Sequence, residues 1–231
     1  MRVKSTLILL FLIGSMVSHA QETAEEKTSG WYMYFGTNRV SERLSIHTEA
    51  QFRFYGTMDN LNQFQLRTAL NYHMGPNAMA SIGYVHADTD PTFEELPGEA
   101  NVKENRIYGQ FVMKNQLWEF LVRHRYRLEH RIFDSGDTTD NRQRARYQLQ
   151  LTLPLTDTFF LNFSDELLIN LQDDLFDQNR LYGALGVNIT WNSSIEIGYM
   201  RNQFSHAVYN RLMVGVHFNP DLRSLFVKKK S

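Results

Sequence analysis

The sequence lacks cysteine, has little proline and carries almost no net charge. The absence of cysteine excludes a disulfide framework, a thiolate metal site, a cysteine nucleophile and a lipidated cysteine anchor. Lys and Arg number 24 against 25 Asp and Glu, so the charge balance gives no basic footprint, and we expect no nucleic-acid partner. The 5 prolines and 13% aromatic residues favour strands and interfaces over helices. The composition therefore indicates a β-rich protein.

No apolar run is long enough to cross a membrane as a helix. Residues 7–17 form an apolar segment of about 11 residues, whereas a spanning helix needs about 20. The segment follows Arg2 and Lys4, and residues 18–20 place small side chains where a signal peptidase reads them. We therefore predict that residues 1–20 are a signal peptide cleaved after Ala20 and that the protein is exported.

The rest of the chain alternates between apolar and polar side chains. Between residues 44 and 55, and again between 118 and 131, most residues of one parity are apolar and most of the other are polar. A period of two predicts strands with one apolar and one polar face. Eleven segments are candidates, namely residues 29–40, 44–55, 63–73, 78–87, 104–114, 118–131, 142–154, 158–171, 179–191, 194–204 and 207–218.

The length of these segments and of their connections indicates a transmembrane barrel. Most exceed the usual strand of about 5–6 residues and approach the 9–11 that a tilted strand needs to cross a bilayer. Tight turns alternate with longer acidic connections at 56–62, 88–103, 132–141 and 172–178, with a short exception at 205–206. We predict an all-β fold, a transmembrane antiparallel β-barrel of 10 to 12 strands over residues 29–218, with short periplasmic turns and longer extracellular loops. A polar segment, 21–28, precedes it, and a basic tail, 219–231, follows.

A soluble periplasmic barrel or sandwich is the alternative. There, the apolar parity would face an internal core and the charged parity would face water. Strand length and turn asymmetry favour the membrane. So do aromatic residues near strand ends, where interfacial girdles lie, namely Trp31, Trp118, Phe159, Trp191 and Phe218.

Six short pieces of the chain carry a resemblance to a known family. They are residues 30–35 (GWYMYF), 50–53 (AQFR), 124–131 (HRYRLEHR), 142–147 (RQRARY), 165–170 (DELLIN) and 177–183 (DQNRLYG). Together they resemble a domain-of-unknown-function family of small outer-membrane proteins from Gram-negative bacteria. The resemblance covers essentially the whole mature chain. It implies a transmembrane β-barrel in the outer membrane, and it brings no established catalytic or ligand residues.

The predicted number of strands is odd, which creates a problem of parity for the direction of the first strand. If the tight turns are periplasmic, the last ten segments close with both ends periplasmic, and residues 29–40 must start on the extracellular side. A twelfth strand at 221–227 would resolve this, as would partial burial of residues 29–40 inside the barrel. Threading of residues 21–28, which carry three Glu and one Lys, through the lumen would also resolve it.

The polar parity carries many arginines toward the lumen, the space inside the barrel. The main candidates for a charge network or anion ring are Arg53, Arg67, Arg123, Arg125, Arg127, Glu129, Arg142, Arg144, Arg146, Glu166 and Arg180. The same parity holds Arg106, Arg131, Arg211, Glu49, Glu104, Glu119 and Glu196. One interpretation is a rigid mesh of Arg–carboxylate pairs that fills the lumen of a structural scaffold. The other is a narrow pore that prefers small anionic solutes.

An enzyme or lipid-binding protein acting at the membrane face is the second class of function. His124, Tyr147 and Asp165 fall on the lipid-facing parity at similar depth, where a carboxylate needs compensation. A β-bulge near Asp165, or a local contact among the three, would provide it. The chain has neither a Gly-x-Ser-x-Gly elbow nor a His-Glu-x-x-His metal site. We therefore expect a non-enzymatic protein with no catalytic residues, no cofactor and no metal, and with outer-membrane lipid around it. Protein partners are not predicted.

Overall fold

The structure is a computed structural model that describes residues 28–93, 100–136, 138–172 and 174–226. The signal peptide and residues 21–27 lie outside the described residues. Cleavage after Ala20 and threading of the N-terminal segment therefore stay predictions.

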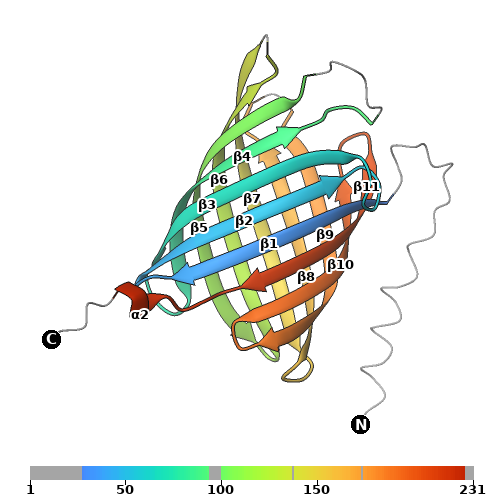
Figure 1. Ribbon diagram of the computed structural model, residues 1–231. Coiled ribbons are helices and arrows are strands. Elements are labelled where there is room, and N and C mark those ends of the chain that lie inside the picture. The colour runs from blue at the N-terminus through green and yellow to red at the C-terminus, as the bar shows by residue number, and fades with distance from the viewer. Residues whose placement is uncertain (1–27, 94–99, 137, 173, 227–231) are drawn as a thin grey trace.

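Eleven strands form a closed barrel (Figure 1). The all-β fold and the predicted range of 10 to 12 strands are confirmed. The strands are β1 (Ser29–Arg39), β2 (Leu44–Phe54), β3 (Leu61–His73), β4 (Ala78–Thr89), β5 (Val102–Leu117), β6 (Phe120–Asp134), β7 (Thr139–Pro154), β8 (Phe159–Asn170), β9 (Phe176–Thr190), β10 (Ser193–Gln203) and β11 (Val208–Phe218).

The barrel closes through a parallel pair, so the prediction of a purely antiparallel barrel is wrong at this seam. β1 pairs with β11 in parallel, from Ser29 opposite Arg211 to Gly36 opposite Phe218. All other neighbours are consecutive in sequence and antiparallel. The cause is the odd number of strands, because the first and last strands of an odd meander run in the same direction. The parity problem is thereby resolved, since β1 is part of the wall.

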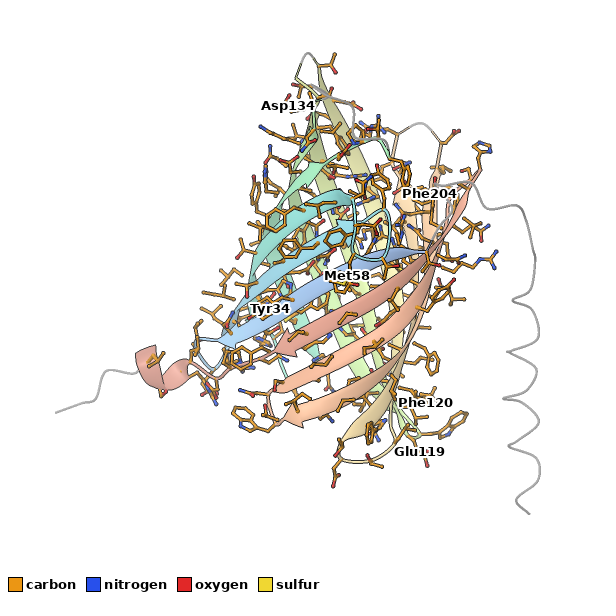
Figure 2. All side chains as sticks on the ribbon, turned by 45° about the vertical axis from the view of Figure 1, so that its right-hand side comes forward. Tyr34, Met58, Glu119, Phe120, Asp134 and Phe204 are labelled. Carbon is orange, nitrogen blue, oxygen red and sulfur yellow. The ribbon has the colours of Figure 1, made fainter. Side chains whose placement is uncertain are left out.

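The two barrel ends differ less than the sequence predicts. At the turn end, the end where β1 and β11 finish, connections are short, as between β5 and β6. At the loop end, the connection from Thr89 to Val102 is the longest. The predicted loop 132–141 is mostly strand, because β6 runs to Asp134 and β7 begins at Thr139. This hairpin projects beyond the rest of the rim (Figure 1), with Asp134 at its tip (Figure 2).

Gly30 lets the first loop pack over the start of the closing seam. Its N–H donates to the Gly56 carbonyl at 2.7 Å, and a Cβ on Gly30 would lie 1.8 Å from the Thr57 carbonyl oxygen. Only glycine permits so close an approach of two backbones. The loop thereby covers the loop end of β1.

The distribution of side chains is inverted relative to a soluble protein. On β2, Ser45, Glu49 and Gln51 point inward and are buried, whereas Ile46 and Phe52 are exposed on the outside. An apolar exterior around a polar interior is the arrangement of a barrel in a bilayer. A soluble barrel needs its apolar side chains inside and its polar side chains outside. The observed arrangement would instead expose a large apolar surface to water, so the soluble alternative does not fit.

The aromatic girdle is only partly as predicted. Trp118 and Trp191 lie in tight turns at the turn end and are 83% and 84% exposed, and Phe159 and Phe218 are exposed near them in the fold. Trp31 is only 5% exposed and lies in the lumen, so its assignment to the girdle is wrong. The physical reason is that β1 carries aromatic side chains on both parities, so that alternation does not identify its inner face.

The C-terminal segment docks on the turn end and adds no strand. Asp221 makes one isolated parallel bridge to Arg39, and the short helix α2 (Arg223–Phe226) follows. The predicted alternative of a twelfth strand at 221–227 is therefore wrong over its described residues. No helix in the described part of the chain is long and apolar enough to cross a bilayer.

The Asp221–Arg223 pair should make stability depend on acid pH. The Arg223 side chain donates to both oxygens of Asp221, at 2.9 and 2.6 Å, and lowers the pKa of Asp221 from 3.8 to about 2. Because the pKa of Asp221 is lower in the folded state, the pair contributes its full stabilisation at pH values above the ordinary pKa of 3.8. This contribution is lost as the pH falls through about 2.

We expect D221N to melt below the parent protein at neutral pH and together with it below pH 2. The measurement is thermal unfolding across the acid range. R223Q also removes the ion pair of Arg223 with Glu42, so it should melt no higher than D221N at neutral pH. A difference that persists in strong acid would contradict this assignment.

Candidate functional site

A single cavity runs along the lumen from one barrel end to the other. Its volume is about 750 Å³. His73, Lys114 and Asn219 line it at the turn end, and Asn62 and Phe204 line it at the loop end. Spread over an apolar band about 25 Å tall, this volume corresponds to a mean cross-section of roughly 30 Å². The cavity is therefore narrow on average.

The lining of this cavity is strongly basic. Eleven arginines and Lys114 line it against four glutamates. The lining arginines are Arg53, Arg67, Arg106, Arg123, Arg125, Arg127, Arg131, Arg144, Arg146, Arg180 and Arg211, and the glutamates are Glu49, Glu104, Glu166 and Glu196. An excess of fixed positive charge in a space walled by low-dielectric protein favours anions over cations.

Glu129 is the centre of one group of ion pairs. Its carboxylate is fully buried and accepts hydrogen bonds from Arg144 at 2.7 and 2.9 Å and from Arg146 at 2.8 Å. Arg106 and Arg127 each approach it to 3.5 Å. The cross-strand register of β5, β6 and β7 brings these side chains together. Several guanidinium groups thus share one carboxylate, whose charge offsets only part of theirs.

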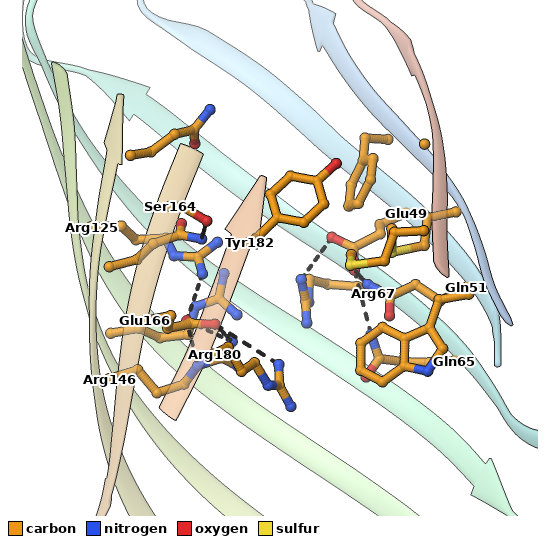
Figure 3. Close-up of a pocket in the computed structure, with 18 of the residues that line it drawn as sticks. Glu49, Gln51, Gln65, Arg67, Arg125, Arg146, Ser164, Glu166, Arg180 and Tyr182 are labelled. Carbon is orange, nitrogen blue, oxygen red and sulfur yellow. Dashed lines mark hydrogen bonds and ion pairs between the residues drawn. The ribbon is translucent and has the colours of Figure 1, made fainter. Parts of the chain in front are cut away.

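Glu166 and Glu49 form two further centres on opposite sides of the pocket (Figure 3). Glu166 accepts from Arg146 at 2.8 and 2.9 Å and from Arg125 at 2.6 Å. Glu49 accepts from Arg67 at 2.6 Å and contacts His47 at 3.0 Å. These carboxylates accept several charge-assisted hydrogen bonds, the strong kind in proteins.

Several basic side chains have no carboxylate partner. Among the residues that the structure describes, Arg53, Arg123, Arg211 and Lys114 form no ion pair. Arg53 donates to the amide oxygens of Gln51 and Gln63, and Arg123 lies 3.3 Å from that of Gln150. The three arginines have neutral hydrogen-bond partners in place of carboxylates, so together with Lys114 they contribute to the excess positive charge of the lumen.

Two predicted lumen residues lie elsewhere. The Arg142 side chain is 59% exposed and pairs with Asp140 at 2.6 Å on the projecting hairpin, so its assignment to the lumen network is wrong. Glu119 lies in the turn between β5 and β6 and is exposed. Strand parity predicts the face of a side chain but not its height along the barrel axis, and both residues lie beyond the enclosed part of the wall.

Trp31 and Lys114 line the cavity, although the sequence analysis did not place them there. Trp31 lies opposite Arg53 in the β1–β2 register, which is the one signal that would have placed it among lumen residues. Lys114 lies opposite Arg123 in the β5–β6 register. The Trp31 assignment requires the pairing of neighbouring strands, which alternation within one strand does not supply. Lys114 has the same parity as Glu104 and Arg106 on β5, so alternation alone would have placed it in the lumen.

The residues of the predicted lipid-face site are not brought together as a set. His124 Nδ1 lies 2.9 Å from the Tyr147 hydroxyl, and both side chains are on the outer face. Asp165 instead accepts a hydrogen bond from Asn179 at 2.6 Å. Leu149 lies between His124 and Asp165 in the strand register. The predicted bulge is not found near Asp165, since the irregularity of β8 and β9 lies at Leu168 and Ile169.

Metal binding has no candidate cluster in the described ranges. No group of three His, Asp or Glu side chains there is arranged to hold a metal ion. The carboxylates of the lumen are occupied by arginines instead.

Comparison with known proteins places the chain in a family. No curated protein matches it. The siderophore receptor PirA from Pseudomonas aeruginosa is 12% identical with a TM-score of 0.32, over 75% of this chain and 34% of the receptor. A porin is 15% identical with a TM-score of 0.37, over 81% of this chain and 60% of the porin.

A family model matches the chain over most of its length. The model described as "Protein of unknown function (DUF2490)" matches residues 28–213. That range includes all of the strands from β1 to β10 and all eleven arginines that line the cavity. The resemblance inferred from the short sequence pieces is confirmed, and the chain belongs to this family of proteins of unknown function.

Proposed function

We propose that the protein is a non-enzymatic outer-membrane channel of a Gram-negative bacterium that conducts small anions through a narrow, arginine-lined lumen. The observation that carries this proposal is the continuous cavity with its excess of basic side chains. The predicted signal peptide supports export, and the apolar outer face supports insertion in a bilayer.

The size and charge of the lumen support small anions as the solutes. A mean cross-section of roughly 30 Å² over a band about 25 Å tall suits ions and compact oxyanions better than sugars or peptides. Rings of Arg and Lys select anions in known pores. Basic side chains also occur at both ends, with Lys114 and Arg123 toward the turn end and Arg53 and Arg211 toward the loop end.

A rigid scaffold is the second candidate, and the ion-pair groups favour it. The arginines around Glu129 and Glu166 cross-link neighbouring strands, which stiffens the wall. Such a mesh is built from arginines that contact carboxylates. It does not need Arg53, Arg123 and Arg211, whose charges are unpaired within the described chain. These three side chains are therefore the basis for preferring the channel.

Conductance in a planar bilayer tests the proposal. The purified protein is expected to give small, discrete current steps in KCl, and its reversal potential under a salt gradient should show a preference for Cl⁻ over K⁺. The triple variant R53Q/R123Q/R211Q is expected to lose most of this preference, because it removes three lumen charges without touching a carboxylate pair.

The matched control is R142Q, which removes the same chemical group outside the lumen and should leave selectivity unchanged. A folded barrel that gives no current steps would favour the scaffold instead. Preference for K⁺ would contradict the proposal directly.

A further inference from the structure

Three arginines converge on one buried tryptophan near the loop end of the lumen. The guanidinium carbon of Arg53 lies 3.9 Å from the centre of the Trp31 ring, that of Arg211 lies 4.9 Å away and that of Arg180 lies 5.6 Å away. They come from β2, β11 and β9, and Trp31 comes from β1. The cluster therefore occupies the wall on both sides of the parallel seam.

This cluster is poor in carboxylates. Arg53 is held by the amide oxygens of Gln51 and Gln63, at 2.5–2.9 Å, and Arg211 donates to the Ser29 hydroxyl at 2.6 Å. Among the residues that the structure describes, the one carboxylate that pairs with any of these three arginines is Glu166, 3.8 Å from Arg180, and it is already engaged by Arg125 and Arg146. Neutral partners orient the guanidinium groups but leave their charge uncompensated.

The cluster also contains buried polar atoms without partners. Trp31, only 5% exposed, and Arg211 each have a buried donor, Nε1 and Nε respectively, that finds no hydrogen-bond acceptor within the described part of the chain. Asn202, which lies opposite Arg180 in the β9–β10 register, has an unpaired buried amide oxygen. Buried polar groups are nearly always hydrogen-bonded, so unpaired donors beside uncompensated cations are suited to bind an anion.

The chemistry of the ligand follows from this donor set. Forked guanidinium groups match oxyanions that present several acceptor oxygens, and three cations favour a doubly charged anion over a singly charged one. A halide has no directional acceptors to match the forks. Hydrogen phosphate offers several acceptor oxygens and one hydroxyl, which the free Asn202 oxygen can accept.

We infer that Trp31, Arg53, Arg180 and Arg211 form a binding site for a phosphate group, carried by inorganic phosphate or a compact phosphomonoester. The inference rests on the proposed channel only in that the site would bind the permeating solute. The site would act near the loop-end mouth, since the pairing of β1 with β11 begins there, with Ser29 opposite Arg211.

Tryptophan fluorescence tests the site without measuring transport. The chain has three tryptophans, and the double variant W118F/W191F leaves Trp31 as the sole reporter. Both replaced residues are exposed in turns at the opposite barrel end. In detergent at pH 7 and constant ionic strength, inorganic phosphate should change the Trp31 emission saturably, with an affinity at least about tenfold above that for chloride. A titration with methyl phosphate tests whether the site also binds a phosphomonoester.

Arginine variants in this background identify the contacts. R53Q and R211Q are each expected to weaken phosphate binding about tenfold or more, since each removes one forked, charge-assisted contact. R53K, which keeps the charge but loses the fork, should bind with intermediate affinity. The matched control R142Q should bind as the background does. Far-UV circular dichroism checks that each barrel is folded, and R53K and R211Q decide the matter if R53Q does not fold.

The outcomes separate this inference from the proposed channel. Anion-selective conductance without a saturable phosphate response would overturn the site and leave the channel intact. A saturable response without conductance would support the site and overturn the channel. Equal responses to phosphate and chloride, or an effect of R142Q as large as that of R211Q, would also overturn the site.

Discussion

Replacement of Ile197 by Arg is expected to lower the free energy of unfolding by about 2–4 kcal/mol in lipid vesicles. Ile197 lies in the middle part of β10, points outward and is 57% exposed. Its register partners Leu185 and Val214 are also apolar. In the apolar band of a bilayer, the guanidinium group would have to be desolvated or to distort the lipid around it. Denaturant titration of the vesicle-inserted barrel measures the change.

Leu155→Arg is the matched control for depth. Leu155 is exposed in the turn after β7, where an arginine reaches the interface and should cost about 0–1 kcal/mol. In a barrel surrounded by water, an exposed Ile197→Arg would be nearly neutral. Equal and small effects of the two variants would therefore contradict membrane insertion of this face.

Replacement of Glu129 by Ala is expected to cost about 3–5 kcal/mol of stability. The Glu129 carboxylate is fully buried and lies within 3.5 Å of four guanidinium groups. Its removal leaves these charges close together without compensation, and breaking a buried ion pair from one side is far more costly than losing an exposed one. The shift in denaturant midpoint, measured with an unchanged slope, gives the loss.

Glu119→Ala provides the control within the same pair of strands. Glu119 is exposed in the turn between β5 and β6, so its loss should change stability by less than about 0.5 kcal/mol. If E129A were as mild as E119A, the ion-pair group would not stabilise the wall, and the scaffold interpretation of the lumen would lose its main support.

Local pattern accounts for much of what could be predicted from the sequence. The alternation on either side of Glu49 or Arg125 is a property of one strand, since successive side chains point to opposite faces. It was therefore sufficient to identify the eleven strands and to separate the outer face from the inner one. It was insufficient on β1, where Trp31 and Tyr32 are both aromatic and both parities fit a membrane face.

The height of a side chain along the barrel axis and its ion-pair partner can be read only from the assembled barrel. Arg142 has the same parity as Arg144, yet the first pairs with Asp140 outside the rim and the second with Glu129 inside it. The difference arises because the β6–β7 hairpin extends past its neighbours. Whether an arginine is neutralised depends on the register between strands, which places Arg146 between Glu129 and Glu166.

The sequence by itself determined the β-barrel class, the inward phase of the arginines and the family, because each is written in local alternation or in short motifs. Only the tertiary structure decided the closure. An odd number of strands forces β1 beside β11 in parallel, and this seam brings Trp31 together with Arg211, which are 180 positions apart in the chain. Such contacts depend on where a ring closes, a global property that no local pattern in the sequence encodes.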